Sequence, residues 1–296
     1  MTDKWKRIVW LVVEAMLFVF VLVAVCGILL LWAGVFSTML GIDTNDKDMN
    51  SPFAMLSEGG MAIGCVLGLW VVDYVHRHVF PQAKDYGMGL ALKGGHMGQL
   101  LAGIGVAAAL YATGFLVVWL LGGIGITDVG VHPGALVQTW VFFLLVAVFE
   151  EGMCRGFLLG RMMDAGINKF TALVLSSAVF SCLHLANPGF ALLPFINLLL
   201  AGVLLGAAYI YTRNLWFAIG LHWFWNWLQG PILGFEVSGN VLEGSLLTLE
   251  EPAEAVLLNG GTFGFEGSLV CTVLMVAGIG LIIRHYEKKR TLAVND

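Results

Sequence analysis

Long apolar stretches dominate this chain, and we count eight of them in its 296 residues. A helix needs about 20 mainly apolar residues to cross a hydrocarbon core roughly 30 Å thick. In lipid, backbone polar groups must find partners inside the protein, as they do in a helix. We therefore predict an all-α, polytopic membrane bundle that forms a single domain over 1–296, with spans at about 8–36, 59–80, 98–122, 134–158, 169–185, 191–212, 214–233 and 266–284.

The composition excludes other classes of protein. Apolar residues make up 59% of the chain and charged residues only 12%, whereas about 25% of a soluble domain is charged. This excludes a soluble enzyme and a disordered chain. The net charge of -5 offers no basic surface for phosphates, so no nucleic-acid partner is expected. The five cysteines lie in apolar stretches without a CxxC spacing, which indicates neither a disulfide framework nor a thiolate metal site.

The charges also predict an orientation, because short cytoplasmic loops are enriched in Lys and Arg. With the N-terminus inside and eight alternating spans, all of the 15 basic residues except Lys47 fall on inner segments. Acidic residues gather outside, at Asp43, Asp46 and Asp48 and in the segment 234–265, which we expect to be a solvated loop or a lid. Both termini are therefore predicted to be cytoplasmic.

Three polar sets interrupt the predicted spans. An ionisable side chain inside a span is costly and is by default a candidate for function. Each set has the i, i+4 spacing that places two side chains on one face of a helix. The sets are Glu150-Glu151-Gly-Met-Cys-Arg155, Phe180-Ser-Cys-Leu-His184 and His222-Trp-Phe-Trp-Asn226.

Two other acids, Glu14 and Asp73, stand alone near the ends of their spans. Long or charged side chains in such places usually reach the interface or pair with a neighbour. We expect the same of these two.

In the first polar set, Glu150 and Glu151 are expected to have different roles. Glu151 and Arg155 are four residues apart, so they can form an ion pair on one helix face. Glu150 points about 100° away and is free to face a cavity. We therefore assign Glu150 as the acid or base and the pair as its support.

The other two sets supply the remaining groups that the hydrolysis of an amide needs. A carboxylate and an imidazole can bind and deprotonate a water, which fits Glu150 with His184. A second imidazole and an amide can stabilise the oxyanion that forms when water attacks a carbonyl, which fits His222 with Asn226. The residues thus indicate metal-free amide hydrolysis.

A metal mechanism uses the same side chains. Glu150, His184 and His222 could together hold zinc, although the HExxH spacing does not occur. No cofactor is expected, and zinc is the alternative. The chain has no GxSxG and no GxGD segment, which removes the usual serine and aspartate alternatives.

The motifs resemble those of the CPBP family, the CAAX protease and bacteriocin-processing proteins, also called ABI proteins. This family includes the eukaryotic prenyl-protein endopeptidase, and its motifs are EExxxR, FxxxH and HxxxN. Phe180 begins the second motif here, and Asn197 matches an asparagine that is frequent between the second and third. The motif core spans 134–233.

The resemblance implies a glutamate-type intramembrane endopeptidase of a bacterial cytoplasmic membrane. Its water would be activated by Glu150 and His184, and its oxyanion site would be formed by His222 and Asn226. Membrane lipid and a peptide or protein substrate are the implied partners, and the substrates of eukaryotic relatives are lipidated. A catalytically idle scaffold or bacteriocin-immunity protein that binds peptides in the same cavity is the alternative. A proton-coupled transporter is a third hypothesis, without the matching broken helices that would support it.

One conflict arises from the predicted spans. At 1.5 Å per residue, His184 lies about 22 Å beyond Lys169, whereas Glu150 lies about 8–12 Å from the inner surface. We expect the fifth span to start deeper than Lys169, with the segment 159–170 dipping into the cavity.

Overall fold

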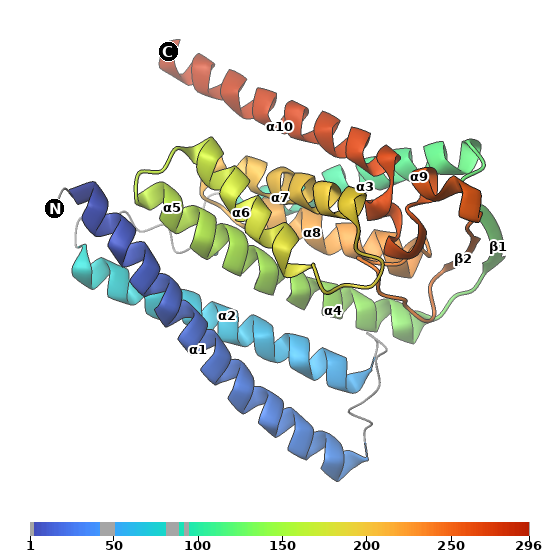
Figure 1. Cartoon of the computed structure of the whole chain (residues 1–296), viewed down its shortest axis with the longest axis horizontal. Helices are drawn as coiled ribbons and strands as arrows, with labels where there is room; N and C mark the ends of the chain where they lie inside the picture. Colours follow the sequence, from blue (N-terminus) through green and yellow to red (C-terminus); the bar gives the residue numbers. More distant parts are fainter. Residues whose placement is uncertain (1–2, 42–50, 81–88, 92–94, 296) are drawn as a thin grey trace.

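The computed structural model describes residues 3–41, 51–80, 89–91 and 95–295. Eight longer helices make up most of this part of the chain (Figure 1), and they are α1 (Asp3–Leu40), α2 (Pro52–Val79), α3 (His96–Leu120), α4 (Pro133–Glu151), α6 (Lys169–Leu183), α7 (Leu192–Thr212), α8 (Trp216–Trp227) and α10 (Leu269–Asn295). The shorter elements are α5 (Gly160–Asp164), α9 (Val256–Asn259), the strands β1 (Gly125–Val129) and β2 (Leu247–Glu250), the π-helical η2 (Gly152–Leu159) and η3 (Leu228–Ile232), and three 3₁₀ turns within 253–267.

The predicted all-α polytopic bundle is confirmed. Among the described residues, six helices are long and apolar enough to cross a membrane. The predicted spans at 169–185 and 214–233 correspond to the shorter α6 and to α8 continued by η3. The count of eight spans and the side on which the termini lie remain predictions.

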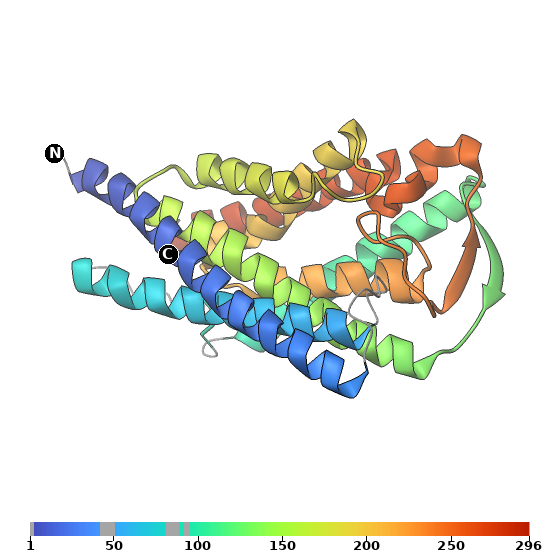
Figure 2. The ribbon, with the colours of Figure 1, turned by 60° about the horizontal axis from the view of Figure 1, so that its bottom comes forward.

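The two ends of the bundle differ. Both termini, α5 and the connection from α7 to α8 lie at one end, which we call the terminal end (Figures 1 and 2). The antiparallel pair β1–β2 lies at the other, the hairpin end, with Gly125 opposite Glu250 and Val129 opposite Leu247. The acidic segment 234–265 belongs to the hairpin end and is partly ordered, because it contributes β2, α9 and the buried Phe263. The first acidic loop, with Asp43, Asp46 and Asp48, lies outside the described residues.

The fourth span is longer than predicted, because α4, η2 and α5 form one apolar rod, Pro133–Asp164. Glu150 therefore lies about 21 Å from Asp164 along the helix axis, at 1.5 Å per residue. By the same measure His184 lies about 22 Å from Lys169, so Glu150 and His184 lie at nearly the same depth. The expectation that 159–170 dips into a cavity is wrong, because Gly160–Asp164 continues the rod.

A buried ionic cluster ties the α1–α2 hairpin to this rod. The Arg161 guanidinium lies 3.2 Å from Oε2 of Glu14 and 3.1 Å from Oδ1 of Asp73. His76 Nδ1 lies 2.6 Å from Oε1 of Glu14. Because Glu14 is only 1% exposed, these contacts supply the partners that a buried carboxylate requires. The predicted pairing of both single acids is confirmed.

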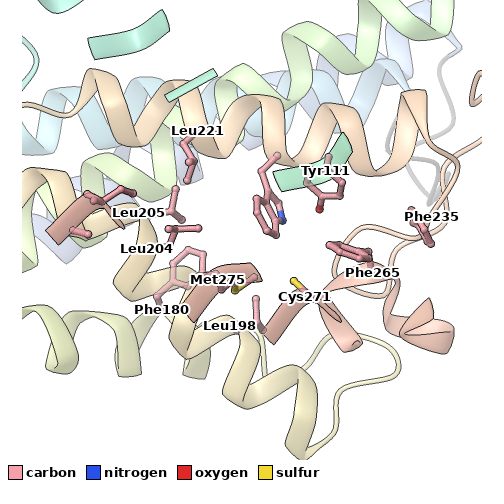
Figure 3. Close-up of a cluster of buried hydrophobic side chains, with 14 of the residues drawn as sticks. Tyr111, Phe180, Leu198, Leu204, Leu205, Leu221, Phe235, Phe265, Cys271 and Met275 are labelled. Carbon is pink, nitrogen blue, oxygen red and sulfur yellow. The ribbon is translucent and has the colours of Figure 1, made fainter. Parts of the chain in front are cut away.

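The central core lies where α3, α7, α8 and α10 meet. Figure 3 shows its side chains converging from these helices, among them Leu198, Leu204, Leu221 and Met275. Glycines allow α3 and α8 to approach closely, as is common between helices in membranes. A Cβ atom at Gly103 would meet the Phe217 carbonyl oxygen at 2.1 Å. This close contact helps to hold α8, and the polar residues on it, in the interior.

Candidate active site

A cavity of about 410 Å³ lies between α4, the end of α6, α7 and α8. Glu150, His184, His222 and Asn226 all line it. The structure thus brings the four side chains predicted to act together into one space, although they come from three separate helical segments.

Glu151 joins the first and third motifs. Its side chain is fully buried, and its Oε1 accepts hydrogen bonds from NH1 of Arg155, at 2.7 Å, and from Nδ1 of His222, at 2.9 Å. The ion pair expected within the helix is therefore present. The sequence did not reveal that the same carboxylate also holds the histidine of another helix.

Arg155 and Phe180 form the support beneath this contact. The Arg155 guanidinium lies over the Phe180 ring, 4.5 Å from its centroid, and NH2 donates to the Gly202 carbonyl at 3.1 Å. The Phe180 ring also lies 6.0 Å from the His222 ring, at an interplanar angle of 76°. Phe180 is therefore the aromatic contact between the arginine of the first motif and the histidine of the third.

Glu150 points into the cavity rather than to the ion pair. Its side chain is 20% exposed, and Nε2 of His222 lies 3.8 Å from its Oε2. This oxygen is buried and has no hydrogen-bond partner among the described residues. A carboxylate oxygen without a protein partner can accept a hydrogen bond from a water or a substrate.

A backbone carbonyl determines which ring nitrogen of His184 carries a proton. This residue follows the last residue of α6, and its Nδ1 lies 2.8 Å from the Phe180 carbonyl oxygen. A carbonyl oxygen only accepts hydrogen bonds, so Nδ1 carries the proton. In the neutral ring Nε2 is then a free base at the cavity wall.

Asn226 lies one helical turn after His222 and is 6% exposed. Its side chain lines the cavity, and no hydrogen bond joins it to another described residue. The amide can therefore donate to a group that enters the cavity.

Asn197 has a different environment. It is fully buried and absent from the cavity lining. Its Nδ2 donates to the carbonyl oxygens of Glu266, at 2.7 Å, and Ser268, at 2.8 Å, and its Oδ1 accepts from Thr272 at 2.6 Å. It supports the site from outside by fixing the chain just before α10.

Sequence analysis missed two carboxylates that line the cavity. Glu266 accepts hydrogen bonds from Nε1 of Trp225, at 3.0 Å, and from the backbone N–H and Oγ of Ser238, at 3.0 and 2.7 Å. Glu58 on α2 lines the cavity near Glu150. Both acids stand at the edges of predicted spans, at 266 and just before 59, and so resembled ordinary loop charges.

Zinc stays a prediction, as the alternative to metal-free hydrolysis. In the described part of the chain, no three His, Cys, Asp or Glu side chains are grouped so that they could hold a metal ion. His222 directs Nδ1 to Glu151 and His184 directs Nδ1 to its own helix, an arrangement that leaves Nε2 of each ring available to water, substrate or a metal.

The fold and the cavity define a class: an integral membrane protein whose interior holds acid, base and hydrogen-bond donor side chains. Residues 132–228 match the family model of the Rce1-like proteins, described as type II CAAX prenyl endopeptidase Rce1-like. The matched segment covers about a third of the chain and contains all three motifs, and the match supports the resemblance to the CPBP/CAAX protease family. The family indicates intramembrane peptidase activity in general terms. Comparison with curated proteins and with solved structures gave no match.

Proposed function

We propose that the protein is a metal-independent endopeptidase that hydrolyses a peptide bond inside the membrane with a water activated by Glu150 and His184. One observation carries the proposal. The cavity collects all four predicted side chains, and Oε2 of Glu150 and Nε2 of His184 make no hydrogen bond within the described protein.

The first step is attack by water on the substrate carbonyl carbon. The water donates one hydrogen bond to Glu150 and one to His184, and one of these bases takes its proton as the carbon–oxygen bond forms. The same proton then passes to the leaving nitrogen as the carbon–nitrogen bond breaks. The products are a carboxylic acid and an amine, so no further reactant is needed.

The second requirement is stabilisation of the oxyanion. His222 already donates from Nδ1 to Glu151, so it can donate from Nε2 as well only as an imidazolium. The charges of Glu150 and Glu151 then balance those of Arg155 and protonated His222. The amide of Asn226 is the second donor.

The cavity wall favours a peptide with apolar side chains. Phe142, Phe143 and Val146 line one side of it, and Leu204 and Leu205 line another. A lipid chain on the substrate would find apolar contacts on the same walls. Membrane lipid is the surrounding solvent, because the six long helices expose apolar side chains.

The test begins with the substrate. Membrane peptides are compared by mass spectrometry between cells that express the wild type and cells that express Glu150→Ala. The purified protein is then expected to cleave the identified peptide in detergent, and Glu150→Ala and His184→Ala are expected to abolish cleavage while thermal stability stays near that of the wild type. The exposed Glu254→Gln is the control and is expected to retain activity.

The outcomes separate the alternatives. Cleavage that survives Glu150→Ala overturns the assignment. Inhibition by a chelator that zinc reverses supports the metal mechanism instead. A cellular phenotype that is intact in a well-expressed Glu150→Ala strain supports the non-catalytic scaffold.

A further inference from the structure

The cavity is closed toward the terminal end. Below its floor, formed by Leu205 and Leu221, the buried side chains of Leu159, Leu173 and Ile210 pack together. Below them lies an ionic layer, in which Arg213 donates to Asp164 at 2.7 Å and Arg161 pairs with Glu14 and Asp73. No element of this layer lines the cavity. A peptide cannot enter here without breaking buried ion pairs, which is costly.

The lining extends instead toward the hairpin end. Asn187 follows the end of α6, and Ser238 and Asn240 belong to the segment between η3 and β2. Glu58 lies in the first part of α2, the part next to the hairpin end (Figure 1). Asn187, Ser238 and Asn240 thus belong to connections between helices and strands rather than to the helices that carry Glu150 and His222.

Exposed side chains mark the mouth. Leu183, the last residue of α6, lines the cavity and is 54% exposed. Across from it, Phe149 and Glu150 on α4 and Glu58 on α2 are half-buried. Because Leu183 and Phe149 are apolar and lie on membrane-facing helices, the mouth borders the hydrocarbon layer on this side and continues toward the hairpin end.

The ends of the bundle carry opposite charge. Basic residues gather at the terminal end, as at Arg77, Lys288 and Arg290, whereas the hairpin end carries Glu243, Glu250 and Glu254. Positive charge marks the cytoplasmic side of a membrane protein. The cavity therefore opens toward the side of the membrane away from the cytoplasm.

We infer that the substrate is a peptide segment that reaches the cavity from the non-cytoplasmic side of the membrane and enters between α4 and α6. Exported peptides and the outer ends of membrane-spanning segments belong to this class. That the ligand is a substrate rests on the proposed function, whereas the side of access follows from the cavity lining and from the charges at the two ends of the bundle.

The experiment measures access with a membrane-impermeant maleimide. Asn187→Cys and Asn240→Cys place a thiol at the cavity, and Arg290→Cys, at a side chain that is 66% exposed, places one at the terminal end. All three are made with Cys182→Ala, which removes an exposed native thiol. Intact cells, sealed inverted vesicles and detergent-solubilised protein are labelled in parallel.

We expect both cavity thiols to react in intact cells and the terminal thiol to react only in inverted vesicles. Reaction of all three from one face overturns the inference, as does failure of both cavity thiols to react in sealed membranes or in detergent. Reaction of the terminal thiol in intact cells also overturns it, because the cavity would then face the cytoplasm. Labelling needs no turnover, so its result is separate from that of the activity test. A Glu150→Ala version is expected to label like its parent whether or not the wild type cleaves peptides.

Discussion

Replacing Glu151 by glutamine removes one negative charge from the centre of the site at nearly constant volume. In the wild type, one carboxylate oxygen accepts from Arg155 at 2.7 Å and from His222 at 2.9 Å. A neutral amide oxygen cannot hold two cations at these distances inside a protein. Of the two, only the imidazolium can lose its charge, because the guanidinium stays protonated. We therefore expect His222 to become neutral in this variant.

The size of the effect follows from the role of His222. A neutral ring that donates from Nδ1 has no proton on Nε2, so one of the two oxyanion donors is lost. Loss of one such donor costs about 10²–10³ in kcat, or about 2.7–4 kcal/mol of transition-state stabilisation. KM is expected to change little, because the oxyanion exists only after attack. Arg155 keeps the Gly202 carbonyl and the Phe180 ring, so the variant is expected to fold.

Initial rates on the identified peptide, measured in detergent, test this expectation. The matched control is Glu254→Gln, the same change at an exposed position. Thermal unfolding of both variants shows whether folded protein is compared with folded protein. A kcat for Glu151→Gln within about threefold of the wild type, less than about 1 kcal/mol in the barrier, would refute the charge balance proposed for the site.

Two predictions concern stability. Arg161→Met leaves Glu14 and Asp73 buried without their cation, and we expect the free energy of unfolding in denaturing detergent to fall by about 3–5 kcal/mol. The control Arg290→Met breaks an exposed pair and is expected to lower it by under about 1 kcal/mol. Equal losses in the two variants would contradict the role of the cluster. In the hairpin-end loop, burial and then the Glu236 carboxylate raise the pKa of Glu251 from 4.5 to about 7. The folded loop therefore binds the proton more tightly, and its stability is expected to be greatest below pH 4.5 and to fall as the pH rises to 7. Limited proteolysis of 234–265 across this range measures it, and Glu251→Gln should flatten the profile; an unchanged profile would contradict the assignment.

The motif residues could be predicted from the sequence because membranes make buried charge rare. An ionisable residue such as Glu150 or His222 is costly inside an apolar helix, so its presence there indicates a function. The i, i+4 spacing placed the Glu151–Arg155 pair correctly, because that contact is local to one helix. Asn197 could be noted but not placed, since its partners lie around residues 266–272.

Glu266 and Glu58 could not be found in the same way. Each stands at the edge of an apolar stretch, where a charge ordinarily meets water. Only the packing of α2 against α4, and of the chain before α10 against α7, turns these acids inward. The fourth span is longer than the predicted 134–158, because Arg161, just beyond that range, is buried in an ion pair rather than exposed at the membrane surface.

The amino-acid sequence alone was enough to predict a helical membrane protein and to single out three polar sets as the candidate site. These conclusions follow from local properties: apolar length, helical periodicity and the cost of an unpaired charge. The tertiary structure was needed to show which nitrogen of His184 and of His222 makes a protein contact and which acids line the cavity. It was also needed to show toward which end of the bundle the cavity opens. Those features depend on contacts between helices far apart in the chain, such as Glu151 with His222, and no pattern within one helix encodes them.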